Sequence, residues 1–91
     1  MAIASFRHRE LKKLYNGKKA RLDAAWIDVL LIIFDALDSM GSVDELKGFR
    51  GFHALTGNRK GHYSLKVTAN WRLTFTFDGT DAHDLDLEDY H

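Results

Sequence analysis

The sequence ends on two side chains that can do chemistry, Tyr90 and His91. Terminal residues seldom bury enough surface to offset the entropy of ordering them. A phenol and an imidazole at this place are therefore either dispensable or part of a site built from the terminus. Two other residues offer complementary chemistry: His53 can act as an acid or a base near neutral pH, and the planar guanidinium of Arg72 can bind a phosphate through two parallel hydrogen bonds.

Strand alternation gives Arg72 a direction. Apolar and polar residues alternate over 71–77, so we expect Arg72 on the face opposite Trp71 and Leu73, in the middle of a sheet. From the residues alone, Arg72 is either a phosphate ligand or a cross-strand partner of Asp84 or Asp86.

The acidic residues of the last strand raise a metal alternative. Asp84, Asp86 and Glu88 fall on one face by alternation, where a divalent cation is one reading and a solvated face the other. The sequence has no cysteine and no His/Cys cluster with zinc spacing. We expect neither a metal nor another cofactor.

Charge is arranged in blocks although the net charge is zero. Residues 1–21 carry seven Lys/Arg against one Glu, and residues 22–46 carry six Asp/Glu and no base. Residues 47–72 carry six Lys/Arg and no acid, and residues 73–91 carry six Asp/Glu and no base. A folded chain of this kind can present a basic face to a polyanion, and the alternative is a set of unrelated solvated faces. The pattern favours a nucleic-acid partner without establishing one.

The elements that must position these residues follow from periodicity and turn signals. Ninety-one residues suffice for one domain, residues 1–91, with one core. The order, helices first and then an antiparallel meander, predicts an α+β fold of two layers. The expected elements are a short strand at 3–6, a helix at 7–15, a helix between Asp23 and Gly41, a short turn of helix after a capping box at 42–45, an extended segment at 49–55 and strands at 63–67, 71–77 and 82–88.

Targeting signals are not expected in this sequence. Charge arrives by Arg7, which is too early for a signal-peptide apolar stretch, and the apolar cluster at 29–34 is far too short to span a bilayer. We therefore expect a soluble cytoplasmic protein without membrane contact.

Several motifs resemble one known family when they are taken together. Residues 55–67, which contain Gly57-Asn58-Arg59-Lys60-Gly61, residues 70–75 and the ending Glu88-Asp89-Tyr90-His91 resemble HigB-type toxins of the RelE/ParE superfamily of bacterial toxin–antitoxin modules. The resemblance covers essentially the whole chain. It implies two N-terminal helices packed on a twisted antiparallel sheet, as in microbial ribonucleases.

The resemblance also implies an activity and its partners. It implies ribosome-dependent cleavage of messenger RNA in the decoding site and neutralisation by a helix-turn-helix antitoxin of the HigA kind. Operator DNA would be bound only through the antitoxin complex. Two alternatives remain at this stage: a non-catalytic ParE-like inhibitor of a protein target such as gyrase, and an RNA-binding relative with weakened catalysis.

Carried over residue by residue, the resemblance implies that the catalytic residues are His53, Arg72, Tyr90 and His91. Thr56 stands where some members have a catalytic Lys, so Arg59, Lys60 or Arg72 alone would neutralise the substrate phosphate instead.

The same resemblance gives the first helix a role. Arg9, Lys12 and Lys13 on its basic face would contact ribosomal RNA phosphates.

Overall fold

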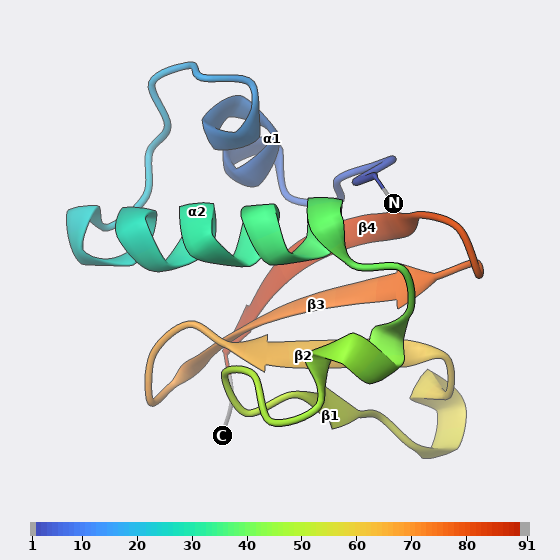
Figure 1. The fold of residues 1–91 in the computed structure, drawn as a ribbon. Coiled ribbons are helices and arrows are strands. Elements are labelled where there is room, and N and C mark those ends of the chain that lie inside the picture. Colours follow the sequence, from blue (N-terminus) through green and yellow to red (C-terminus); the bar gives the residue numbers. More distant parts are fainter. Residues whose placement is uncertain (1, 90–91) are drawn as a thin grey trace.

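Two helices lie on one face of a twisted antiparallel sheet in the computed structural model, which describes residues 2–89 (Figure 1). This arrangement confirms the predicted α+β fold of two layers. The elements are α1 (Arg9–Tyr15), α2 (Ala24–Ser39), the 3₁₀ turn η1 (Val43–Leu46), β1 (His53–Ala54), the 3₁₀ turn η2 (Gly57–Arg59), β2 (His62–Lys66), β3 (Trp71–Phe77) and β4 (Ala82–Asp89).

The four strands pair in chain order, β1-β2-β3-β4, and all three pairings are antiparallel. Arg72 of β3 has Lys66 and Glu88 as its Cα partners on the two neighbouring strands. The turn between β3 and β4 is held by Asp78, whose Oδ1 accepts hydrogen bonds from the backbone N–H groups of Thr80 and Asp81. Such an Asx turn explains why the Asp78-Gly79 signal predicted this hairpin correctly.

Local capping explains where the helices begin. Asp23 Oδ1 accepts a hydrogen bond from the N–H of Ala25 and starts α2, as predicted. His8 Nδ1 accepts from the N–H of Glu10, so α1 begins at Arg9 and not at Arg7. The capping box is also confirmed, because the Glu45 carboxylate accepts the N–H of Ser42 at the start of η1.

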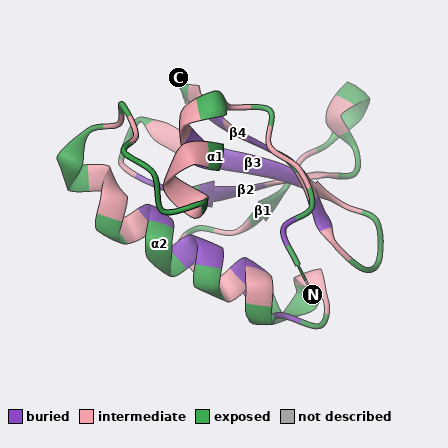
Figure 2. Ribbon diagram, turned by 90° about the horizontal axis from the view of Figure 1, so that it is seen from above, coloured by how far each residue is buried: buried purple, intermediate pink, exposed green. Residues whose placement is uncertain are grey.

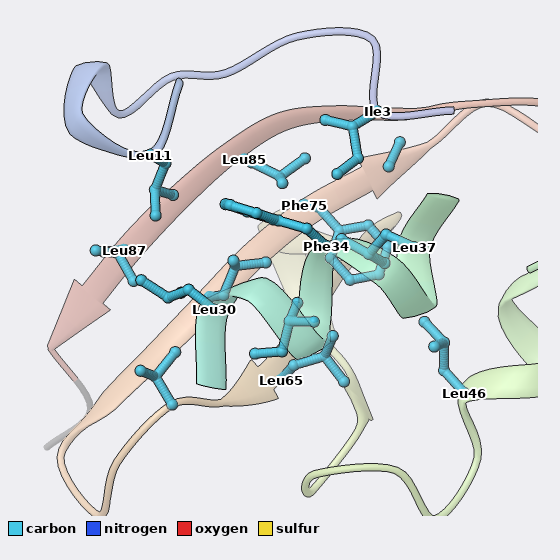
Figure 3. Packing of buried hydrophobic residues seen from close by; sticks show 14 of the residues in the cluster. Ile3, Leu11, Leu30, Phe34, Leu37, Leu46, Leu65, Phe75, Leu85 and Leu87 are labelled. Atoms are coloured by element: carbon cyan, nitrogen blue, oxygen red, sulfur yellow. The ribbon is translucent and has the colours of Figure 1, made fainter. Parts of the chain in front are cut away.

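The core lies between α2 and the sheet, where the buried side of the helix meets the central strands (Figure 2). In Figure 3, Leu30, Phe34 and Leu37 of α2 approach Phe75 of β3 and Leu65 of β2. Burial of a large aliphatic or aromatic side chain contributes about 1.5–3 kcal/mol. This apolar layer fixes which face of the sheet is covered by helices and which remains open.

Two segments differ from their predicted form. The segment at 3–6 makes only isolated parallel bridges to β4, at Ile3 and Phe6, and is not a regular strand. The segment at 49–55 is not extended throughout, because Arg50 and Gly51 have φ angles of 43° and 62° and turn the chain into the two-residue strand β1. Arg50 anchors that turn by donating from Nε to the carbonyl of Lys66 at 2.8 Å.

A β-bulge corrects the prediction for the last strand. The register shifts between Thr74 and Thr76, and Asp84 takes a φ of 55°. The extra residue brings Leu85 and Leu87 back into the core and leaves Asp86 and Glu88 on the open face. The prediction that Asp84, Asp86 and Glu88 share one alternating face is therefore wrong at Asp84.

Within residues 2–89, no helix combines the length and the apolar character that crossing a bilayer demands.

Candidate active site

A pocket of about 550 Å³ lies over the open face of the sheet, the face opposite the core residues of the strands. Strands β2, β3 and β4 supply its base and one side, and the chain from β1 through η2 supplies the other side. The lining residues are Gly51, His53, Leu55, Thr56, Asn58, Arg59, Ser64, Arg72, Thr74, Glu88 and Asp89.

The pocket brings together four residues that the sequence singled out, His53, Thr56, Arg59 and Arg72. They come from β1, the residue preceding η2, η2 and β3, so no local motif contains them all. Lys60 is exposed just after η2 and does not belong to the lining.

The proposed catalytic pair Tyr90 and His91 lies outside the described residues. Asp89, the residue before this pair, is an exposed member of the pocket lining.

The base of the pocket is built from polar side chains that are nevertheless buried. Ser64 and Thr74 are only 5% and 4% exposed, although they lie on the face opposite Leu65, Leu73 and the helices. Their burial indicates that the segment from β1 to η2 covers this part of the sheet. Nearby, Gly51 approaches Arg72 so closely that a Cβ at Gly51 would lie 3.7 Å from Nη1.

Arg59 reaches across this base to β4. Its Nη1 and Nη2 donate to Oε1 and Oε2 of Glu88 at 2.5 and 2.6 Å, which is a bidentate ion pair. The Thr74 hydroxyl donates to the same carboxylate at 2.6 Å. The cation that was expected to bind substrate phosphate thus already holds an internal carboxylate.

This pair shifts the pKa of both of its members. The hydrogen bonds from Arg59 hold the pKa of Glu88 at about 2, below its ordinary value of 4.5, against the opposing effect of burial. Thr74 lowers the pKa of Glu88 further. Reciprocally, Glu88 raises the pKa of Arg59. Glu88 is therefore an anion at every physiological pH and a weak base.

Stability should respond to acid through this carboxylate. Because folding lowers the pKa of Glu88, its contribution is fully present above pH 4.5 and is lost as the pH falls toward about 2. For a half-exposed pair the contribution is on the order of 1 kcal/mol. Chemical denaturation of the protein and of Glu88→Gln should give unfolding free energies whose difference shrinks between pH 6 and pH 2.5.

The Glu88→Gln comparison separates this effect from another carboxylate. Asp78 also has a pKa lowered to about 2, chiefly by the backbone N–H of Asp81 and by His83. Both the unmodified protein and Glu88→Gln keep Asp78, so the titration of Asp78 cancels in the difference between their unfolding free energies. A difference that stays constant over the whole pH range would contradict the role given to Glu88.

Helix α1, which carries Arg9, Lys12 and Lys13, lies on the same side of the sheet as α2 (Figure 1), whereas the pocket is lined by residues of the open face. Arg9 and Lys12 are exposed, whereas Lys13 is half-buried and pairs with Glu10 at 3.4 Å. A ligand of the pocket and a ligand of α1 would therefore be held by opposite sides of the protein.

The acidic residues of β4 do not converge. Asp84 lies in the bulge, Asp86 accepts from the backbone N–H of Leu87 and Glu88 binds Arg59. Over the described part of the chain, no group of three or more His, Cys, Asp or Glu side chains is arranged to hold a metal ion.

Sequence reasoning missed the role of Glu88 and Thr74 in this pocket. Alternation along β3 places Thr74 on the same face as Arg72, and this pattern could have indicated that Thr74 lies in the pocket. The partner of Glu88 had no such signal, because Arg59 is 29 residues away and lies in a loop.

Known proteins match this chain over almost its full length. A family model described as the RelE-like toxin of the type II toxin–antitoxin system HigB matches residues 4–91. Endoribonuclease HigB of Proteus vulgaris is 38% identical over 91 residues, an alignment that covers 98% of this chain and 99% of that protein. The chain therefore belongs to the HigB-like family of RelE-like toxins, which act in type II toxin–antitoxin systems together with an antitoxin partner.

Proposed function

We propose that this protein is a ribosome-dependent endoribonuclease that cleaves messenger RNA in the decoding site by acid–base chemistry without a metal ion. The observation that carries the proposal is the pocket that gathers His53 and Arg72 beside the end of β4. It is supported by the relative in Proteus vulgaris, which is named an endoribonuclease.

The chemistry assigns a task to each side chain. The ribose 2′-hydroxyl is the nucleophile, so one group must remove its proton and another must protonate the leaving 5′-oxygen. His53 and His91 share these two duties. Arg72 stabilises the charge that develops on the phosphorane, because its planar fork matches two phosphate oxygens. Tyr90 stacks on a base or donates a proton.

Substrate binding draws on the segment around η2. Thr56 lines the pocket and offers a hydroxyl where some family members carry Lys, so it contributes a hydrogen bond and no charge. Lys60 is exposed beside the pocket and supplies a positive charge for the RNA backbone. Arg59 contributes indirectly, through the ion pair that it forms with Glu88.

The opposite face serves the ribosome. Arg9 and Lys12 are exposed on α1, and Lys13 adds a third positive charge there. On this proposal they bind ribosomal RNA phosphates while the pocket holds the messenger. The antitoxin is a helix-turn-helix protein of the HigA kind, and operator DNA is bound only by the toxin–antitoxin complex. The protein acts in the cytoplasm, where ribosomes are found.

A cleavage assay on ribosomes programmed with a defined messenger tests the proposal. We expect discrete cuts at the codon in the decoding site and no cuts in the same messenger without ribosomes. Because EDTA disturbs ribosomes, the metal dependence is tested on intact programmed ribosomes. Cleavage should persist at the lowest Mg²⁺ that keeps ribosomes intact, with transition metals chelated.

The same protein, tested also in a DNA supercoiling assay, distinguishes the other activities. An intact messenger together with arrested DNA supercoiling would favour inhibition of gyrase. Ribosome binding without cuts would indicate an RNA-binding relative with weakened catalysis, which is the result expected if Thr56 cannot replace Lys.

A further inference from the structure

Glu88 is an unexpected group in a pocket that receives a phosphodiester. A carboxylate repels phosphate, and its desolvation is unfavourable unless it is paired. Here Glu88 is half-buried and lies opposite Arg72 in the pairing of β3 with β4. Its presence in the lining therefore calls for a function other than contact with the RNA backbone.

The bonds around Glu88 fix its carboxylate on both sides. Arg59 binds both oxygens, and Thr74, which is buried in the central strand, donates to Oε2. A carboxylate held by three short hydrogen bonds has little rotational freedom. Glu88 is thus a rigid acceptor built on two paired strands.

Arg59, by contrast, belongs to a short 3₁₀ turn. The backbone bonds of η2 are local: the N–H of Arg59 donates to Thr56, and the N–H of Lys60 donates to Gly57. The segment begins beside β2 at Leu55, whose N–H donates to His62. The Arg59 side chain joins this turn to β4, at the far edge of the sheet from β1 (Figure 1).

We propose that Glu88 is a positioning residue: with Thr74 it holds the fork of Arg59, and so fixes the η2 segment as the wall of the RNA pocket. The inference rests on the proposed function for its effect on cleavage. Because Thr56 and Asn58 lie in the same segment, their places relative to Arg72 and His53 follow from the Arg59–Glu88 pair. Misplacing a substrate-binding group by about 1 Å can cost on the order of a hundredfold in rate.

Glu88→Gln tests the proposal, since the amide keeps the shape and one acceptor oxygen but loses the bidentate ion pair. We expect kcat for messenger cleavage on programmed ribosomes to fall by roughly ten- to a hundredfold. The KM for ribosomes should change by less than about twofold, because the α1 face is untouched. Amide hydrogen exchange of the free protein should accelerate at 57–61.

Asp86→Asn is the matched control. It removes the same charge from the same strand, and Asp86 also raises the pKa of Arg59, so it reproduces the long-range electrostatic effect without touching the pair. Its Oδ1 acceptor for the N–H of Leu87 is retained in Asn. We expect cleavage and exchange at 57–61 to stay within about twofold of the unmodified protein.

A second pair of variants approaches the carboxylate from the other side. Thr74→Val preserves volume in a buried position and removes the hydroxyl, whereas Thr74→Ser keeps it. Thr74→Val should accelerate exchange at 57–61 and lower kcat, and Thr74→Ser should restore both. If Thr74 only stabilised the fold, Thr74→Val and Thr74→Ser proteins of equal thermal stability would show the same exchange at 57–61 and the same kcat.

The outcomes separate this inference from the proposed function. If Glu88→Gln bound RNA more tightly and kept its kcat, Glu88 would be competing with the substrate phosphate for Arg59. That result would overturn the positioning role. Unchanged exchange at 57–61 would overturn it as well. If the unmodified protein cut no messenger, the proposed function would fail, and the exchange comparison would still decide whether Glu88 fixes the segment.

Discussion

Removal of Tyr90 and His91 is expected to lower messenger cleavage by at least about a hundredfold and to abolish toxicity. On the proposed mechanism the deletion takes away one of the two proton-transfer groups together with the phenol, and each acid–base group contributes roughly 10²–10⁴-fold. Within the described residues 2–89 the core is complete without this pair, so the unfolding free energy should change by less than about 0.5 kcal/mol. Cleavage on programmed ribosomes, growth arrest and denaturant unfolding measure the three quantities.

Replacing both residues by alanine controls for chain length. The alanine variant keeps the backbone beyond Asp89, so equal loss in the two variants assigns the effect to the side chains. Antitoxin binding should survive in both, and this can be measured by co-purification of the complex. A truncated protein with full cleavage activity would remove Tyr90 and His91 from the site.

Arg72 illustrates what alternation can predict. Leu73 and Phe75 are fully buried against the helices, which leaves Arg72 and Thr74 on the other face, as the pattern over 71–77 requires. The hairpin signal at Asp78-Gly79 and the cap at Asp23 were likewise local, and the structure confirms both. Local sequence patterns therefore predict the two layers and the direction of the β3 side chains that line the pocket.

The pocket itself depends on features that no local pattern encodes. The φ angles of Arg50 and Gly51 turn the chain before His53, and a non-glycine residue at positive φ is uncommon enough to escape prediction. The bulge at Asp84 changes which residues of β4 face the core and which face the pocket. A strict period of two therefore misplaces Asp84 while placing Arg72 correctly.

The Arg59–Glu88 pair is the clearest case of a non-local choice. Both residues were noticed, Arg59 as a phosphate ligand and Glu88 as a member of an acidic face. Their pairing requires η2 to fold back over β2 and β3, which the sequence does not reveal. The formal charge of the described lining is consequently balanced and not basic, because Glu88 and Asp89 line the pocket together with Arg59 and Arg72.

Arg72→Lys should reduce kcat for messenger cleavage on the order of ten- to a hundredfold while the fold remains intact. The substitution keeps the positive charge, but an ammonium cannot make two parallel hydrogen bonds to phosphate oxygens. Loss of one donor to a developing oxyanion commonly costs on the order of 10²-fold. Single-turnover cleavage on programmed ribosomes measures this step apart from ribosome binding.

Lys66→Gln is the matched control for charge. Lys66 is the Cα partner of Arg72 on β2, is exposed and does not line the pocket, so its neutralisation changes the local field without removing a pocket donor. Arg72→Gln should lose at least as much activity as Arg72→Lys, and Lys66→Gln should stay within about threefold, with a loss that shrinks at higher salt. Equal losses in Arg72→Gln and Lys66→Gln would mean that the basic field, and not the Arg72 fork, stabilises the transition state. Because Arg72 lies on the central strand between Lys66 and Glu88, this comparison separates the fixed geometry of one guanidinium from the charge of its surroundings.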